Sequence, residues 1–209
     1  MVARALDTAV YPALVTSTPV RPPAGVLLAA GAGRRAGGPK ALRRAADGTA
    51  WVVAGVRTLA RGGCSPVIVT VGCESDRVAA ALTVSESEVP VVVVRVDDWA
   101  TGQAASVRAG LSAVPATGAE AAVVHLVDLP DVGPEVVRRV LSGAGASSLH
   151  RAGYHGRPGH PVLLGRDHFG PVLDALTGDQ GARGYLQTTP GVRLIECSDL
   201  ATGDDVDHC

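Results

Sequence analysis

Residues 25–40 read GVLLAAGAGRRAGGPK, and this stretch decides the fold class. Its first six residues, 25–30, form a continuous apolar run, which is typical of a parallel strand buried on both faces of a sheet. The glycines from Gly31 to Gly38 predict a tight loop at the carboxyl end of that strand. Backbone N–H groups exposed in such a loop bind anions, typically phosphates. We therefore expect an α/β protein with a phosphate-binding loop after its first strand.

Strand and helix patterns alternate along the rest of the chain. The expected strands span residues 25–30, 66–71, 89–96, 121–127, 161–164 and 192–197. The expected helices span residues 51–61, 75–82, 106–114, 134–141, 167–176 and 181–187. This order predicts an α/β protein in three layers, with a mostly parallel, doubly wound sheet. Residues 143–159 are rich in Gly and polar side chains, and no regular element is expected there.

The composition excludes several classes of protein. The chain has 209 residues, 46% of them hydrophobic and 3% aromatic, so we expect a core of Val, Leu and Ala. Its 19 basic and 20 acidic residues give a net charge of −1, which provides no basic field for nucleic acid or a membrane surface. The 4 cysteines form no C-x-x-C pair, which gives no support for a zinc or redox motif. Residues 1–24 lack the pattern of a secretory signal and are expected to be a flexible leader, with the cytoplasm as the expected location.

Three nucleotide-binding motifs compete for the glycine loop. Residues 31–36 match the G-x-G-x-x-A dinucleotide pattern, but Pro39 would break a helix that began inside it. A P-loop is excluded because Pro39 intrudes and Ala41 stands where a hydroxyl would bind Mg²⁺. We favour an open loop that lies over a nucleoside triphosphate. Arg35 and Lys40, the only lysine of the chain, would then reach the phosphates.

Five motifs, in this order, resemble those of the molybdenum cofactor cytidylyltransferase-like NTP transferases. They are L-A-A-G-x-x-x-R-x-G-x-x-K at 28–40, G-x-x-x-S-[LV]-x-x-G-L at 102–111, D-x-P-x-V at 128–132, Gly-His-Pro at 159–161 and G-D-x-G-A-R at 178–183. The resemblance implies a fold of the nucleotidyltransferase, nucleotide-diphospho-sugar transferase-like type. It also implies one domain over 25–209, with a nucleotide-binding part at 25–141 and an acceptor-facing part at 142–209.

The resemblance further implies a reaction and a set of contacts with the nucleotide. The reaction is Mg²⁺-dependent transfer of CMP from CTP to the phosphate of molybdopterin or molybdenum cofactor, with release of pyrophosphate. Arg35 and Lys40 are the implied catalytic residues, which neutralise charge on the phosphates. Contacts with the nucleotide are implied for Leu28, Ala29, Ala30, Gly31, Gly33, Gly102 and Ser106. The Ala29-Ala30 pair favours cytidine, because guanylyl relatives tend to carry Ala-Gly there.

The metal is expected to be held by Asp128. This residue follows the strand at 121–127, so its carboxylate should lie in the crevice at the carboxyl end of the sheet, where it suits Mg²⁺. Asp131 is a weaker candidate. The family usually carries a second metal-binding Asp near the end of the chain, where this sequence has Ala201. Asp199 or Asp204 would have to take its place.

The acceptor side is less sharply defined by the motifs. The resemblance implies acceptor contacts for His160, Asp179 and Arg183. His150, His155 and His160 recur every five residues, a spacing that does not favour a three-histidine metal site. A molybdoenzyme that receives the finished cofactor is a possible partner.

Two alternatives stay open at this point. One is a transferase that uses GTP and acts on molybdopterin or on a small phosphorylated acceptor such as phospholactate. The other is a non-catalytic accessory protein that binds a nucleotide or cofactor, which the substitution at Ala201 favours.

Overall fold

The computed structural model describes residues 21–34, 37–84 and 87–206, and most of the expected leader at 1–24 lies outside these ranges. One seven-stranded sheet forms the centre of the molecule, in the order β3-β2-β1-β4-β6-β5-β7. Strand β6 runs antiparallel to β4 and β5, and the other neighbouring pairs are parallel. The strands are β1 Ala24–Leu28, β2 Val67–Val71, β3 Val91–Arg95, β4 Ala121–Leu126, β5 Leu149–Tyr154, β6 Arg157–Gly165 and β7 Arg193–Glu196. The expected mostly parallel sheet is confirmed.

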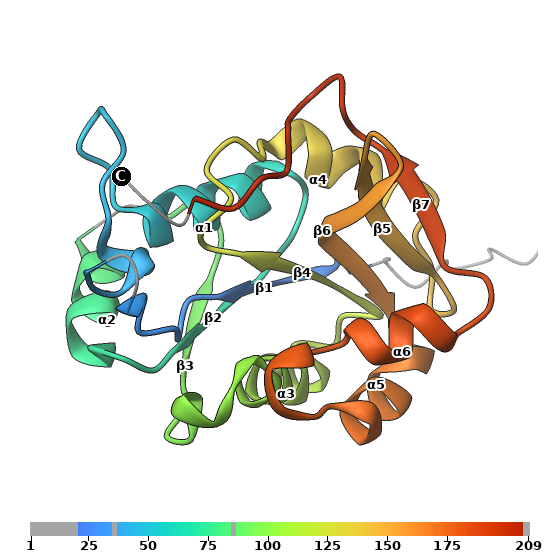
Figure 1. Cartoon of the computed structure of the whole chain (residues 1–209), viewed down its shortest axis with the longest axis horizontal. Coiled ribbons are helices and arrows are strands. Elements are labelled where there is room, and N and C mark those ends of the chain that lie inside the picture. The colour runs from blue at the N-terminus through green and yellow to red at the C-terminus, as the bar shows by residue number, and fades with distance from the viewer. Residues whose placement is uncertain (1–20, 35–36, 85–86, 207–209) are drawn as a thin grey trace, which may run out of the picture.

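Helices cover both faces of this sheet (Figure 1). They are α1 Trp51–Arg61, α2 Ser75–Thr83, α3 Gln103–Ala113, α4 Pro134–Leu141, α5 Phe169–Ala175 and α6 Arg183–Thr188. Helices α1 and α4 lie on one face, and α3, α5 and α6 lie on the other. Alternate strand residues supply the two cores: Val123 of β4 packs with the first group of helices, and Val124 packs with the second. No helix within the described residues is both long enough and apolar enough to cross a bilayer.

Two expectations about the strands were wrong. The valines of β3 were expected to be buried on both faces, but Val92 is 41% exposed and Val93 is 40% exposed. The reason is that β3 is an edge strand, so neighbours cover it less completely than they cover β1 or β4. Strand β5 was missed, because its sequence LHRAGY mixes small and polar residues. It forms nonetheless, because β6 and β7 pair with it on its two sides.

The sheet register decides where the loops after the strands meet. Strands β1 and β4 are parallel neighbours, with Leu28 opposite Leu126. Parallel neighbours end at the same edge, and the backbone N–H of Val127 donates to the carbonyl of Leu28 at 3.2 Å. The loops that carry Lys40 and Asp128 therefore begin side by side.

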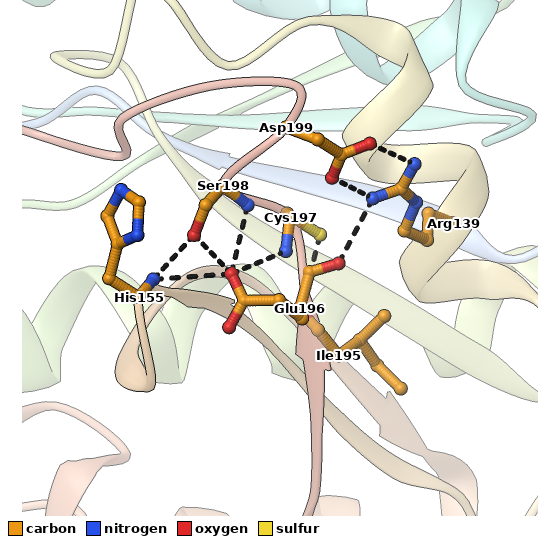
Figure 2. A network of polar contacts seen from close by, with 7 residues as sticks. All are labelled: Arg139, His155, Ile195, Glu196, Cys197, Ser198 and Asp199. Carbon is orange, nitrogen blue, oxygen red and sulfur yellow. Dashed lines mark hydrogen bonds and ion pairs between the residues drawn. The ribbon is translucent and has the colours of Figure 1, made fainter.

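The chain after β7 is held to the sheet by a polar network (Figure 2). The Glu196 carboxylate accepts hydrogen bonds from the backbone N–H groups of His155, at 3.2 Å, and Ser198, at 3.0 Å. Hydrogen bonds from Ser198 lower the pKa of Glu196 to about 2. Arg139 of α4 donates two hydrogen bonds to Asp199. This network connects the β5–β6 turn and helix α4 to the C-terminal segment.

Candidate active site

The glycine loop after β1 folds back on itself. Gly33 has φ +56°, and a Cβ atom there would lie 2.0 Å from the carbonyl oxygen of Gly38, so only glycine fits. The N–H of Gly38 donates to the carbonyl of Gly33 at 3.2 Å. A 3₁₀ turn, Lys40–Leu42, follows Pro39, and among the described residues no α-helix begins before Trp51. This geometry agrees with the open-loop interpretation and not with a dinucleotide motif, which requires a helix at the loop.

Lys40 and Asp128 meet at the carboxyl edge of the sheet. The Nζ atom of Lys40 lies 2.8 Å from Oδ2 of Asp128, and their side chains are only 15% and 20% exposed. The two residues are 88 positions apart, and they meet because β1 and β4 are neighbours. A partly buried cation and carboxylate in contact can bind a phosphate and its counter-cation together.

A cavity of about 520 Å³ opens over this pair. Among its lining residues are the predicted contacts Leu28, Ala30, Gly31, Gly33, Gly102 and Ser106, together with Lys40 and Asp128. Arg34, Trp99, Gln103 and Asp179 line it as well. We had not predicted Arg34, Trp99 or Gln103, although Arg34 lies inside the glycine loop and Gln103 inside the second motif. The cavity therefore gathers the first three motifs at one edge of the sheet.

Two predicted residues need separate comment. Ala29 packs in the core shared with α1 and α4 and is not among the residues that line the cavity, so a contact of its side chain with the nucleotide gains no support and stays a prediction. It packs there because alternate residues along an extended chain point to opposite faces. Arg35 lies outside the described residues, so its predicted catalytic role stays a prediction.

The second and fifth motifs meet at Gly102. This residue has φ +128°, and a Cβ atom there would lie 2.6 Å from Oδ1 of Asp179 and 2.6 Å from the backbone of Gly178. Only glycine allows so close an approach in this conformation. The loop before α3 is thereby packed against the segment before α6, and Asp179 is brought to the first cavity.

A second cavity, of about 590 Å³, adjoins the first. The two share Leu28, Gln103 and Asp179 as lining residues. The second cavity is also lined by His160 and Arg183, which the sequence had suggested for the acceptor side. The site thus consists of two adjoining chambers, with the Lys40–Asp128 pair in the first.

A family model described as the MobA-like NTP transferase domain matches residues 25–194. The chain belongs to this family. The match spans both chambers and the motifs that line them, so the MobA-like domain is the unit that carries the site. The expected family and the expected nucleotidyltransferase type of fold are both confirmed.

Individual proteins show how far the similarity extends. The nicotine blue oxidoreductase of Paenarthrobacter nicotinovorans is 36% identical over 192 residues, which cover 88% of this chain and 91% of that protein. The crystal structure of Rv0371c from Mycobacterium tuberculosis H37Rv is 31% identical with a TM-score of 0.74, and the match covers 91% of this chain and 95% of that one. A manganese complex of Rv0371c from the same organism matches at 29% identity with a TM-score of 0.66, covering 84% of this chain and 88% of that one.

Two carboxylates line the first cavity, those of Asp128 and Asp179, and Asp128 is the one in contact with Lys40. Asp128 lines the cavity, whereas Asp131 lies outside it and accepts a hydrogen bond from the N–H of Thr202 at 2.7 Å. Asp199 is bound to Arg139 and is therefore a poor replacement for the missing carboxylate (Figure 2). Mg²⁺ is often held by one or two carboxylates plus substrate phosphates. Asp128 together with a triphosphate meets that requirement.

Other candidate ligands are not gathered in the structure. Within the described residues, no group of three His, Cys, Asp or Glu side chains could hold a metal ion. Of the three spaced histidines, His150 is buried with Nδ1 2.8 Å from the carbonyl oxygen of Val140, and His155 lies in the exposed β5–β6 turn. Ala201 is partly buried against the core and lines neither cavity.

Burial keeps two histidines near the site neutral. It lowers the pKa of His125, which is 2% exposed on β4, to about 4. It also lowers the pKa of His160 to about 3, with smaller contributions from His125 and Arg151. Near neutral pH the second chamber therefore contains an uncharged imidazole.

Proposed function

We propose that the protein is a Mg²⁺-dependent nucleotidyltransferase that moves CMP from CTP to the phosphate of a molybdopterin-type acceptor and releases pyrophosphate. The observation that carries this proposal is the pair of adjoining chambers, which share Gln103 and Asp179. One chamber brings Lys40 and Asp128 together beside the glycine loop, and the other has room for an acceptor. A cytoplasmic location stays a prediction.

The chain's own residues would act mainly by positioning and by neutralising charge. The glycine loop offers backbone N–H groups to the phosphates, and Lys40 neutralises charge that develops on them. Asp128 would hold the cation, which when bound adds positive charge beside the triphosphate. An oxygen of the acceptor phosphate attacks the α-phosphorus, a new P–O bond forms, and the bond to the β-phosphate breaks as pyrophosphate leaves. Because the chambers adjoin, the acceptor reaches the α-phosphorus without a large movement of the chain.

The lining of the first chamber also explains why a cation is needed. Its described side chains include two cations, Arg34 and Lys40, and two anions, Asp128 and Asp179. Among the described residues these charges balance, so these side chains supply no excess positive charge for a triphosphate. A divalent cation beside Asp128 would supply it.

The preference for cytidine over guanosine is proposed from Ala30. This residue lines the first chamber and is 2% exposed, so its methyl group takes up space at the wall. A smaller pyrimidine suits the reduced space better than a purine does. A GTP-using transferase, with molybdopterin or a phosphorylated acceptor such as phospholactate, remains the rival within the same chemistry.

A second candidate function comes from a named relative. The similarity to nicotine blue oxidoreductase, at 36% identity over 88% of this chain, favours an oxidoreductase as the second candidate. Ala201, which stands where the family usually has a metal-binding Asp, also leaves open an accessory protein that binds a nucleotide or a cofactor for a molybdoenzyme.

One set of assays separates these functions. The purified protein is incubated with Mg²⁺, CTP or GTP, and either molybdopterin or phospholactate, and pyrophosphate release is measured. In parallel, oxidation of NADH and NADPH is followed with a quinone-type dye as acceptor. We expect pyrophosphate release with CTP and molybdopterin, and its loss in Lys40→Ala.

The other outcomes point to the alternatives. Oxidation of NADH or NADPH without pyrophosphate release would replace the transferase by the oxidoreductase. If the protein catalyses neither reaction but a nucleotide raises its thermal stability, the accessory protein is favoured. A ligand at 100 times its Kd should stabilise the fold by about 2.7 kcal/mol, which a thermal-shift panel detects.

A further inference from the structure

Strand β3, Val91–Arg95, ends the sheet beside β2, and its outer edge is unpaired (Figure 1). Within residues 21–34, 37–84 and 87–206, only β2 pairs with it. Its sequence is VVVVR, and Val92 and Val93 are 41% and 40% exposed. These two valines point to opposite faces of the sheet, because successive side chains of a strand alternate. The helices therefore leave apolar surface uncovered on both faces of this edge.

The parallel pairing with β2 decides which backbone groups of β3 point outward. The carbonyl of Pro90 and the N–H of Val96 each form a hydrogen bond of 2.9 Å with β2. In a parallel pair, every second residue of a strand directs both its N–H and its C=O to the same neighbour. The even-numbered residues of β3 therefore bond to β2. The groups that point away from the sheet belong to Val91, Val93 and Arg95.

The devices that usually protect an edge strand do not protect β3. Natural edges are blunted by charged side chains, by proline or by a bulge. The one charged residue of β3 is Arg95, at its end, and Arg95 donates hydrogen bonds to Ser75 and Asp76 of its own chain. Pro90 precedes the strand, but an N–H at that position would point to β2 and not outward. The pairing of β3 with β2 runs from one end of the strand to the other without a register shift, so no bulge turns the edge away.

The outward groups are complementary to those of a second copy of the same strand. In an antiparallel pair, opposite residues exchange both backbone hydrogen bonds at every second position. If two β3 strands meet about a two-fold axis at Val93, then Val93 lies opposite its own copy and Val91 lies opposite Arg95. All three outward-facing residues of each copy are then hydrogen-bonded. The contact uses the same surface on both copies, as a closed two-fold dimer requires.

The side chains are compatible with the same arrangement. On one face, Val93 would meet Val93 of the other copy, and on the opposite face Val92 would meet Val94. Pairs of β-branched side chains on opposite strands stabilise a sheet. Arg95 would lie beside Val91, so no two like charges within the strand face each other directly. A second copy of this chain therefore fits the edge in both its backbone and its side chains.

We propose that β3 is the docking surface for a second copy of this chain, and that the two strands pair antiparallel about a two-fold axis at Val93 to form one continuous sheet. The residues of β3 line neither chamber, so this inference goes beyond the proposed function and does not depend on it. One strand pairs with one strand, and contacts below the standard interface size are weak or transient. We therefore expect a Kd on the order of 10–100 μM.

Sedimentation velocity between about 5 μM and about 500 μM protein measures this association. The proteins are wild type, Val93→Lys, Val93→Pro and the control Leu194→Lys. The control adds the same charge to the other edge strand, β7, where Leu194 is 44% exposed. Val93→Lys would place two like charges directly opposite each other. Val93→Pro removes an outward N–H and leaves the hydrogen bonds to β2 in place.

The wild type and Leu194→Lys should form dimers with similar Kd values. Both substitutions of Val93 should weaken association by at least about 10-fold, while circular dichroism shows an unchanged fold. If Val93→Pro does not fold, Val93→Lys carries the test, because its side chain is exposed. Pyrophosphate release is measured on the same proteins. Its absence would count against the proposed function and leave the result on association standing.

Disulfide cross-linking tests the register of the pair. Two Val93→Cys chains would have their Cα atoms about 5.5 Å apart, within the range of a disulfide. Val91→Cys lies on the same face, but its copy would be about 14 Å away along the strand. With oxidised glutathione as the oxidant, Val93→Cys should give a covalent dimer. Val91→Cys should give no more than the wild type, whose native cysteines set the background.

Four results would overturn the inference. A wild type that stays monomeric over the whole concentration range would show that a second copy does not occupy this edge. A dimer that neither Val93→Lys nor Val93→Pro weakens would place the contact elsewhere. A loss of equal size in Leu194→Lys would show that the contact is not specific to β3. Equal cross-linking of Val91→Cys and Val93→Cys would exclude the two-fold axis at Val93.

Discussion

Gly102→Ala should disturb the contact between the loop before α3 and the segment that carries Asp179, without replacing a charged residue. Gly102 has φ +128° and ψ 177°, a region that is almost restricted to glycine, so an alanine there costs about 1–3 kcal/mol of strain. Its Cβ atom would also lie 2.6 Å from the backbone carbonyl of Gly178. Forcing an atom into such a packed contact costs about 1–3 kcal/mol more. The total of about 2–6 kcal/mol is a large part of the stability of about 5–15 kcal/mol that is typical of a domain.

Two glycines elsewhere provide matched controls. Gly143, with φ +69°, and Gly191, with φ +83°, also have positive φ, but a Cβ atom at either would meet nothing within 4 Å. Alanine at these positions should cost only the backbone strain, about 1–2 kcal/mol. The difference between Gly102→Ala and these controls therefore contains the contact with the segment that carries Asp179, plus any excess of backbone strain at Gly102, up to about 1 kcal/mol.

The assay is urea unfolding followed by circular dichroism, together with titration of CTP and of the acceptor. The chain can relieve the contact by moving residues 178–183 away from α3, and the free energy of unfolding would then fall less while acceptor binding weakens. One of these two losses must exceed that of the controls. If Gly102→Ala matches Gly143→Ala and Gly191→Ala in both stability and binding, the close packing at Gly102 does not position the site, and the reasoning is refuted.

Four further predictions concern single residues. Lys40→Ala should lower kcat/KM for pyrophosphate release by about 100-fold or more. Lys40→Arg should restore it only in part, because a planar guanidinium group replaces the compact ammonium group of lysine. Near-normal turnover in the alanine variant would contradict this prediction. Asp128→Asn should keep the fold but remove most activity and the response to Mg²⁺, so an unchanged Mg²⁺ titration would argue against the metal assignment. Ala30→Gly should raise the ratio of kcat/KM for GTP to kcat/KM for CTP by about 10-fold or more, since one methyl group in a pocket changes discrimination between substrates by roughly that factor. An unchanged ratio would show that Ala30 does not determine which base is used. His125 has a folded pKa of about 4, below its ordinary value of 6.5, so the unfolded chain binds the proton first and stability should fall by about 3 kcal/mol as pH drops from 6.5 to 4. Denaturant titrations at several pH values should show a flatter dependence in His125→Gln, and an equal slope in both proteins would be evidence against a buried neutral imidazole.

Local patterns predicted the parts of the site that depend on one segment at a time. The glycine loop could be recognised because positive φ at Gly33 and a break at Pro39 are properties of neighbouring residues. Helix α1 was predicted with its observed bounds, Trp51–Arg61, because an amphipathic period is visible within one helix. The motifs likewise identified Asp128 and His160 as site residues before any contact was known.

Several features depend instead on the order of strands in the sheet. The 2.8 Å contact between Lys40 and Asp128 joins loops 88 residues apart, and it follows from the pairing of β1 with β4. The exposure of Val92 follows from the position of β3 at the edge, although its local sequence is as apolar as that of the buried strands. Arg151 enters the second chamber only because β5 pairs with β6.

The amino-acid sequence by itself therefore determined the fold class, the glycine loop and the family, since each depends on short runs of residues whose burial and backbone angles depend on their neighbours. Only the tertiary structure decided which loops adjoin, how the two chambers are connected and which arginines face the second one. The physical reason is that strand pairing satisfies backbone hydrogen bonds that any strand can offer. The partner of a strand, and so the neighbours of its side chains, is settled by packing of the whole sheet between its helices.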